Sequence, residues 1–368
     1  MKKEEVRKVN KLERLLSEVS SYTEEHPYLQ HITEVIDTIR SIVFEPGVST
    51  EKSPFLRDYI EIKRYMFAVV LAVAPAALAS IYFYGWRALA MIVVSYVAGG
   101  IAEVAFTLIR KEEITEGFLV TGILFPLILP PNTPLWMVAV GIIIGVILGK
   151  EVFGGTGYNI FNPALVGRVF LTITFPVAMS SEWIIPLTGG WAGFKQFSVD
   201  AVTSATPLGV FANAGTLAPL RKLFLGNIPG CLGESSALLV LAGGVFLMLA
   251  RIIDWRIPVS YLGSVFLFST LGMYLWPNQV APPLFQLLAG GLMFGAIYMA
   301  TDPVSSPTTK EARWVYGVFL GVMTVSIRAF SGYPEGVMFS ILLMNMFAPL
   351  FDEMVMTFRY GPIQKPYK

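Results

Sequence analysis

The chain has 368 residues, 54% of them hydrophobic and 14% charged, with a net charge of +1. Soluble domains carry about 25% charged residues, so the composition indicates an integral membrane protein, and the absence of a basic stripe excludes a nucleic-acid partner. One cysteine and two histidines, both ahead of the first apolar segment, exclude an internal disulfide, a four-thiolate cluster and a bis-histidine haem, and no structural metal site is expected.

Residues 1–64 are polar and predict a helical cytoplasmic region. Apolar residues recur at helical spacing in two runs, starting at Val9 and Leu29, before a break at Pro46 and Gly47. Such stripes are typical of helices that pack on a partner or on the rest of their own protein. The first residues are charged throughout and lack an apolar core, so no signal peptide is expected.

The remainder of the chain is dominated by apolar segments. A helix needs roughly 20 apolar residues to cross a hydrocarbon core about 30 Å thick. On this basis we predict an all-α membrane protein with about ten transmembrane helices, some short or broken by proline: 65–84, 88–109, 117–130, 135–149, 163–179, 237–250, 257–276, 284–300, 314–330 and 337–351. A polar stretch, residues 180–236, separates a first repeat (65–179) from a second (237–355), and a tail (356–368) follows.

The two halves share a layout. Each has an apolar segment that ends in a proline-bearing break, TGILFPLILPP in the first half and GAIYMATDPVSSP in the second. Each then has a segment introduced by a polar proline turn, GYNIFNPALVG and SGYPEGVMFS. Interrupted helices at corresponding positions indicate inverted repeats with a binding site between them.

Lysine and arginine orient the predicted helices. The N-terminal region holds eleven of the 27 basic residues, and the basic loops at Arg110, Lys150, Arg251 and Lys310 fall on the same side. The positive-inside rule therefore predicts cytoplasmic N- and C-termini in a multi-pass protein of the cytoplasmic (inner) membrane. It also places residues 198–209 on the outer side.

Ionisable residues inside the predicted helices cost about 2.5–3.5 kcal/mol each and mark a pathway or an internal pair. Glu103 lies mid-segment beside Gly99 and Gly100, without a basic residue within one helical turn, which favours cation handling. For the arginines, internal pairing with a carboxylate and a functional role both stay open. The other such residues are Arg168, Asp302, Arg328, Glu335 and Asp352.

A glycine-rich loop precedes two asparagines. GGTG, residues 154–157, resembles a phosphate-binding loop, but it lies between two membrane segments, which excludes a nucleotide-binding βαβ unit. The carboxamides of Asn159 and Asn162 are suited to hydrogen-bond the edge of a flat heterocycle. They are equally suited to satisfy backbone groups at the break, and both interpretations stay open.

A stretch rich in hydroxyl groups, SVDAVTSATPLG at residues 198–209, lies within the longest polar interruption. Thr206 followed by Pro207 predicts a helix N-cap. Capping explains these two residues but leaves Asp200 and the other hydroxyls without a role. The alternative is a site at which a group is attached.

Residues 200–206, DAVTSAT, resemble the Asp-x-x-Ser/Thr-Gly-Ala-Thr signature at which a flavin transferase joins FMN to threonine through a phosphoester, with Ser204 in place of the glycine. Longer blocks between about residues 28 and 355 carry the same resemblance: TEGFLVTGILFPLILPP, GKEVFGGTGYNIFNPALVGRVF, FLGNIPGCLGE, MATDPVSS and YPEGVMFSILLMNMFAPLFD. They are similar to the family of B-type subunits of the sodium-translocating NADH:quinone oxidoreductase (Na⁺-NQR), which is shared with the D-type subunits of the Rnf ion-translocating oxidoreductase complex. The long N-terminal region and TEGFLVTG are closer to the former.

The resemblance implies a flavin-carrying subunit of a multi-subunit, redox-driven ion pump. It implies that Thr206 carries covalent FMN and that Asp200 and Ala205 present it to the flavin transferase. It further implies a non-covalent riboflavin near Asn159 and Asn162. The remaining implied positions are Gly99 and Gly100 for quinone, and Asp37, Glu103, Asp302 and Asp352 for sodium uptake.

Three other interpretations stay open: an Rnf-type subunit of a ferredoxin:NAD⁺ oxidoreductase, a cofactor-free channel or solute transporter, and a membrane scaffold for catalytic partners. A colourless purified protein would favour the channel. The sequence contains no NADH-binding fold and no iron–sulfur ligand set, so partner subunits are expected to supply the electrons. It leaves open the donor, the acceptor and whether the ion is sodium or a proton.

Overall fold

The computed structural model describes residues 62–110, 117–180, 183–187, 192–197, 203–277, 279–333 and 335–361. The chain divides into two units, residues 1–68 and 69–368. Nearly all of the predicted N-terminal helical region, Asp37 within it, and Asp200 of the hydroxyl-rich stretch lie outside the described residues.

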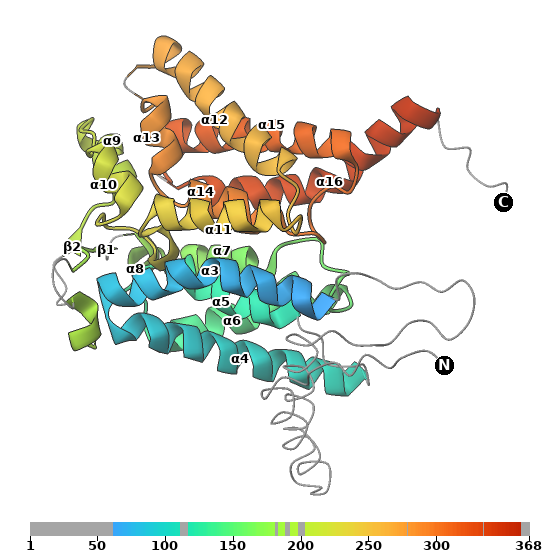
Figure 1. The fold of residues 1–368 in the computed structure, drawn as a ribbon, viewed down its shortest axis with the longest axis horizontal. Coiled ribbons are helices and arrows are strands. Elements are labelled where there is room, and N and C mark those ends of the chain that lie inside the picture. The colour runs from blue at the N-terminus through green and yellow to red at the C-terminus, as the bar shows by residue number, and fades with distance from the viewer. Residues whose placement is uncertain are drawn as a thin grey trace, which may run out of the picture. The chain divides into compact units, whose positions relative to one another are not determined.

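The first group of helices packs through small residues. Its members are α3 (Ile62–Tyr84), α4 (Trp86–Arg110), α5 (Gly117–Leu127), α6 (Leu135–Gly149), α7 (Pro163–Thr174) and α8 (Pro176–Ser180), with a short 3-10 turn, η2 (Glu151–Phe153), after α6. Helix α4 packs on α5 and α6, and α6 packs on α7 (Figure 1). A Cβ atom at Gly145 would lie 2.6 Å from the Pro163 carbonyl, and one at Gly167 would lie 2.5 Å from the Gly141 carbonyl. Glycine is therefore what lets the α6 and α7 backbones touch.

The second group repeats this use of small residues. It comprises α11 (Ala237–Leu249), α12 (Arg256–Leu275), α13 (Pro283–Leu288), α14 (Leu292–Phe294), a π-helical turn η5 (Gly295–Met299), α15 (Lys310–Phe330) and α16 (Val337–Tyr360). Helix α15 packs on both α12 and α16 (Figure 1). A Cβ atom at Gly317 or Gly321 would overlap Ser260 or Ser264 of α12. The two glycines thus fix the close approach of α12 and α15.

Between the groups lies a stretch of short elements. They are β1 (Trp183–Ile184), η3 (Ala192–Lys195), β2 (Thr203–Ser204), α9 (Pro207–Ala214), α10 (Leu220–Leu225) and η4 (Leu232–Glu234). The two strands pair antiparallel, with Trp183 opposite Ser204. This pairing holds the chain directly before Thr206. It is the one β-ladder in the part of the chain that the structure describes.

The π-helical turn η5 and the connecting stretch both contact the first group in the interior. The Tyr298 hydroxyl in η5 donates to the carbonyls of Ala72 in α3 and Val240 in α11, at 3.2 and 3.1 Å. The Leu232 amide of η4 donates to the Leu129 carbonyl just after α5, at 3.1 Å. The connecting stretch is therefore tied into the same interior as both helix groups.

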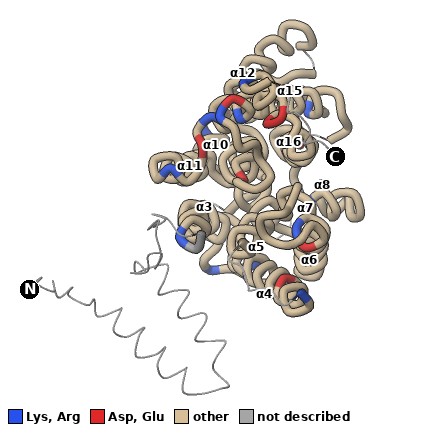
Figure 2. The backbone as a smooth tube through the Cα atoms, turned by 90° about the vertical axis from the view of Figure 1, so that its right-hand side faces the viewer, with Lys and Arg blue, Asp and Glu red and all other residues tan. Residues whose placement is uncertain are grey.

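The all-α membrane class is confirmed. Among the described residues, five helices are long and apolar enough to cross a membrane, and three apolar helices are shorter. Coloured charges are sparse along the helices in Figure 2. The predicted count of about ten spans is not confirmed, because two expected spans are interrupted: 163–179 breaks at Phe175, between α7 and α8, and 284–300 turns at residues 289–291.

Candidate functional site

A cavity of about 350 Å³ lies beside the hydroxyl-rich stretch. Its lining comes from α7, β2, α9, η4, the turn before α14 and the segment before α16. The polar lining includes Arg168, Ser204, Thr206, Glu234 and Glu335, and Leu208 and Met338 add apolar surface. This volume falls within the range of small-molecule pockets. We call it the Thr206 cavity.

Thr206 begins helix α9 at the edge of this cavity. Its backbone is extended, with φ −64° and ψ 156°, and Pro207 occupies the first helical position. Its Oγ1 accepts a hydrogen bond from the Gly209 amide at 3.1 Å. The predicted N-cap is therefore confirmed. Because the same side chain lines the cavity, capping and attachment of a group are compatible.

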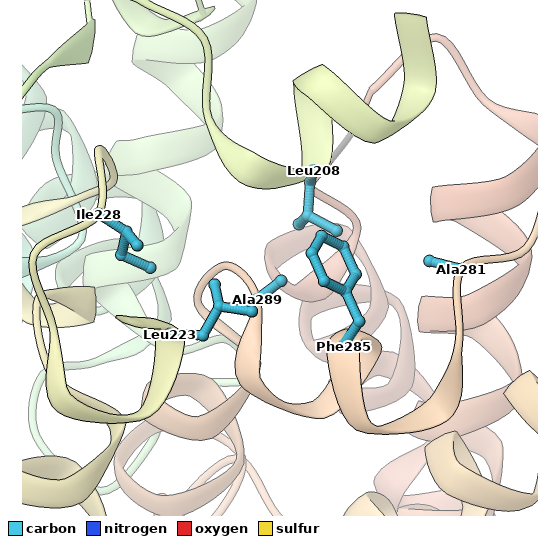
Figure 3. Packing of buried hydrophobic residues seen from close by; sticks show 6 residues of the cluster. All are labelled: Leu208, Leu223, Ile228, Ala281, Phe285 and Ala289. Atoms are coloured by element: carbon cyan, nitrogen blue, oxygen red, sulfur yellow. The ribbon is translucent and has the colours of Figure 1, made fainter. Parts of the chain in front are cut away.

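An apolar cluster holds α9 in place. Leu208, in the first turn of α9, lies against Phe285 of α13 (Figure 3). The rest of the cluster comes from α10, the segments around it and the chain flanking α13: Leu223, Ile228, Ala281 and Ala289. Since Leu208 also lines the cavity, this packing fixes the position of Thr206 relative to the cavity.

Arg168 and Glu234 form the charged wall of the Thr206 cavity. Arg168 extends from α7, is 7% exposed, and donates through Nη2 to the Cys231 sulfur at 3.4 Å. Its Nη1 lies 4.0 Å from Glu234 Oε1. Glu234 Oε2 accepts from the Cys231 amide at 3.3 Å. The pairing interpretation of Arg168 is thus confirmed, although the ion pair is long.

Three buried polar atoms around the cavity form no hydrogen bond within the described chain: Arg168 Nε, Ser204 Oγ and Glu234 Oε1. All three residues line the cavity. Buried polar groups almost always have a partner, so an occupant with polar edges is expected here. The chemistry of the wall fits a flat heterocycle with hydrogen-bonding edges and an apolar face.

A second ion pair lies next to the cavity. Arg328 Nη2 is 3.3 Å from Glu335 Oε1, and Arg328 Nη1 donates to the Gln286 carbonyl at 2.7 Å and its side-chain oxygen at 2.9 Å. The Gly291 amide donates to Glu335 Oε2 at 3.0 Å. Internal pairing of Arg328 is confirmed, and its contacts bind α15 to the turn after α13.

The protonation of Glu234 is set by its surroundings. Burial raises its pKa, and the nearby negative charge of Glu335 raises it further, while Arg168 lowers it. The result is a pKa of about 7, against about 4.3 for a free glutamate. Glu234 was not among the residues that the sequence singled out. Its signal is weak, a glutamate three residues after the single cysteine.

Glu103 is ion-paired at the other end of the first group. Lys150 Nζ lies 2.6 Å from Glu103 Oε1, and the two side chains are 5% and 3% exposed. A neighbouring pair joins Arg110 Nη1 to Glu151 Oε2 at 2.8 Å. The expectation that rested on a missing basic neighbour overlooked Lys150, because this partner is 47 residues away in sequence.

The two glycines near Glu103 face different helices. A Cβ atom at Gly99 would lie 2.9 Å from Ile142 of α6, whereas one at Gly100 would lie 3.4 Å from the Phe118 ring of α5. Gly99 therefore serves helix packing directly. A quinone at these positions stays a prediction.

The asparagines separate into two roles. Asn162 caps α7, its Oδ1 accepting from the amides of Ala164 and Leu165 at 3.1 and 3.4 Å. Asn159 Nδ2 donates to the Phe161 carbonyl at 3.1 Å, and its side chain lies near the Asp302 carboxylate. The structure thus brings together two predicted site residues, one from the break in each half. A riboflavin there stays a prediction.

Asp352 of α16 caps a neighbouring helix. Its Oδ2 accepts from the Thr308 amide and hydroxyl at 2.8 and 3.0 Å, and its Oδ1 accepts from the Thr309 amide and hydroxyl at 2.8 and 2.6 Å. Thr309 is the N-cap residue of α15 and makes no capping bond of its own. Asp352 therefore supplies the acceptors that the start of α15 needs.

Replacing Asp352 with asparagine should lower the free energy of unfolding by about 1–2 kcal/mol, because the amide retains one acceptor oxygen and loses the charge. The measurement is the thermal unfolding midpoint of the purified protein in detergent. Glu353→Gln is the matched control, since this exposed neighbour loses the same charge without the same contacts. Equal midpoints for the two variants would show that the capping contacts contribute nothing.

The sequence is similar to a known family and to named relatives over most of its length. The family described as NQR2, RnfD, RnfE matches residues 49–361. A relative from Klebsiella pneumoniae subsp. pneumoniae, named as the B-type subunit of a Na(+)-translocating NADH-quinone reductase, is 36% identical over 89% of this chain and 92% of its own length. Proteins of the same name from Yersinia pestis (35%) and Pseudomonas paraeruginosa (36%) each match over 94% of this chain and 96% of the relative.

Proposed function

Because the chain belongs to the NQR2, RnfD and RnfE family, we propose that it is the B-type membrane subunit of a redox-driven sodium pump, a Na⁺-translocating NADH:quinone oxidoreductase. Relatives that bear this name match almost their whole length. The name also implies partner subunits, which would deliver the electrons, since this sequence has no NADH-binding fold of its own. The observation that carries the proposal is the Thr206 cavity.

Thr206 would hold FMN through a phosphoester on its Oγ1. The bound group would supply one-electron transfer. The three buried polar atoms of Arg168, Ser204 and Glu234 that lack partners within the described chain would meet its polar edges. Leu208 and Met338 line the same cavity and would cover its apolar face. This agreement between residues and group is what supports covalent FMN here.

The surroundings of Thr206 suit modification by an external enzyme. Ala205 is exposed and Thr206 is half-buried, so the threonine is within reach of a flavin transferase. Asp200 would contribute to its recognition. Basic residues favour cytoplasmic N- and C-termini in the inner membrane, which would place Thr206 on the outer side where such a transferase would act.

Riboflavin, quinone and sodium complete the proposal. Riboflavin would lie near Asn159, whose side chain is close to Asp302 of the second group. The Asn162 side-chain oxygen caps α7. Asn162 would therefore lie close to the riboflavin without using this oxygen to bind it. Quinone would approach Gly99 and Gly100, and sodium would pass the carboxylates of Asp37, Glu103, Asp302 and Asp352.

An inverted repeat would bring these sites together. Helix α6 contacts α4 and α7 in the first group, and α15 contacts α12 and α16 in the second. The connections α4–α5 and α12–α13 also correspond. Ten membrane segments would follow if the short α5, the α7–α8 pair and the α13–α14–η5 segment each crossed part of the bilayer. Such broken helices are usual around transporter binding sites.

The proposal is tested by weighing the intact subunit after expression with a flavin transferase. The expected mass exceeds the encoded mass by one FMN minus one water, which is the change that a phosphoester gives. A polypeptide at its encoded mass that is also colourless would favour a cofactor-free channel instead. Expression without the transferase is the control, and it should yield the unmodified mass.

A further inference from the structure

The Thr206 cavity has a charge arrangement that its role in holding FMN does not by itself require. Two arginines and two carboxylates lie in or beside it, but they are not equivalent. Arg328 and Glu335 are 3.3 Å apart, and each makes further hydrogen bonds. Arg328 Nε has no hydrogen bond within the described chain, but Arg328 does not line the cavity. Arg168 is therefore the one positively charged side chain among the described residues that line it.

The positive charge of Arg168 has no close counter-charge, and its donors are only partly used. Its Nη1 is 4.0 Å from Glu234 Oε1, which is beyond hydrogen-bonding distance. Its Nη2 donates to the Cys231 sulfur, which is a weak acceptor. Its Nε is buried without a hydrogen bond in the described chain. A buried guanidinium with an open donor therefore lines the cavity.

Glu234 reduces the charge of Arg168 only in part. Its Oε2 is held by the Cys231 amide, while its Oε1 has no hydrogen-bond donor within the described chain. Burial and the charge of Glu335 raise the pKa of this carboxyl, which favours its neutral form. Its remaining neighbours are Glu335 from the segment before α16 and Tyr84 from α3. An occupant of the cavity thus meets one guanidinium, Arg168, with the carboxyl groups of Glu234 and Glu335 in the same lining.

The backbone keeps Glu234 from turning away. A Cβ atom at Gly291 would lie 2.6 Å from Glu234 Oε1, so the turn before α14 sits directly against this oxygen. The adjacent Gly290, at φ +68°, shapes that turn and faces Glu335 Oε2. Glycine at both positions gives the two carboxylates their fixed places on either side of the turn.

We propose that Arg168 is the residue that stabilises negative charge on the group attached at Thr206, and that Glu234 limits how strongly it does so. The inference rests on the proposed function. A group held in this cavity that accepts an electron would add one negative charge there, and the buried Arg168 guanidinium in the lining would lower the cost of that charge far more than it would in water. Glu234, when it is a carboxylate, opposes this stabilisation because its own charge is negative.

The test is the one-electron midpoint potential of the covalent flavin, measured by spectroelectrochemistry on the purified complex. Arg168→Gln should weaken electron binding at least tenfold, a shift of about 59 mV to lower potential. Arg168→Lys, which keeps the charge but not the planar fork, should shift the potential less. Glu234→Gln should shift it in the opposite direction, and its amide oxygen still accepts from the Cys231 amide.

Arg221→Gln is the matched control, because it removes a positive charge from an exposed position on α10, where water screens it. Its potential should equal that of the wild type. In-gel fluorescence of each denatured variant verifies that flavin is attached. Wild-type protein without flavin on Thr206 would overturn the proposed function and this inference together. Attached flavin with unchanged potentials in Arg168→Gln and Glu234→Gln would overturn the inference alone. If Arg168→Gln failed to fold, an unchanged potential in Glu234→Gln would be enough to overturn it.

Discussion

We expect one covalent flavin per chain in the wild type and none in the Thr206→Ala subunit. The phosphoester needs the Thr206 hydroxyl, and no other hydroxyl in the described chain both starts a helix and lines the cavity. Loss of the cap adds about 0.5–2 kcal/mol of destabilisation, too little to unfold a typical protein. In-gel fluorescence of the denatured subunit, co-expressed with the transferase, is the measurement.

Thr206→Ser separates attachment from capping and shape. Serine keeps the oxygen that accepts from the Gly209 amide and offers a hydroxyl at the same position, so fluorescence should persist. Ser204→Ala is the neighbouring control: it removes a hydroxyl with no hydrogen bond within the described chain and should leave attachment intact. Fluorescence that survives in Thr206→Ala but not in Ser204→Ala would move the attachment to Ser204.

Local patterns in the sequence predicted the helix caps but not all of the helix interruptions. The Thr-Pro step predicted an N-cap at Thr206, and the Asn-Pro step left backbone hydrogen bonding open for Asn162. Both side chains cap helices in the structure. The interruptions that were missed also had local signals. Phe175 precedes a proline, which disfavours helical backbone at that residue, and Gly290 supplies the positive φ of the turn before α14. Both segments were predicted as continuous helices because most of their residues are apolar.

The charged partners could not be predicted from sequence spacing. Arg168 meets Cys231 from 63 positions away, and Arg328 meets Gln286 from 42. An ionisable residue in a membrane segment predicts that a partner exists but not which residue it is, because the choice depends on how the helices pack. Glu234 shows the same limit. Its role follows from burial beside Arg168 and Glu335, which a loop sequence does not encode locally.

Lys150→Met is expected to destabilise the protein by about 3–5 kcal/mol, because it leaves the buried Glu103 carboxylate without its ammonium. The two side chains are 5% and 3% exposed and 2.6 Å apart, so water cannot replace the lost charge. Glu103→Gln should be destabilising for the converse reason. The measurement is the thermal unfolding midpoint of the full chain in detergent.

The double variant Glu103→Gln/Lys150→Met decides whether the pair itself is responsible. Replacing both members of a buried ion pair with uncharged groups of similar size is often nearly neutral, so the double variant should recover most of the stability that Lys150→Met loses. The nearby Arg110–Glu151 pair is unchanged in all three variants and serves as an internal reference. Additive losses in the double variant would mean that Lys150 stabilises the fold through its packing, and that Glu103 holds its charge without help from this ammonium.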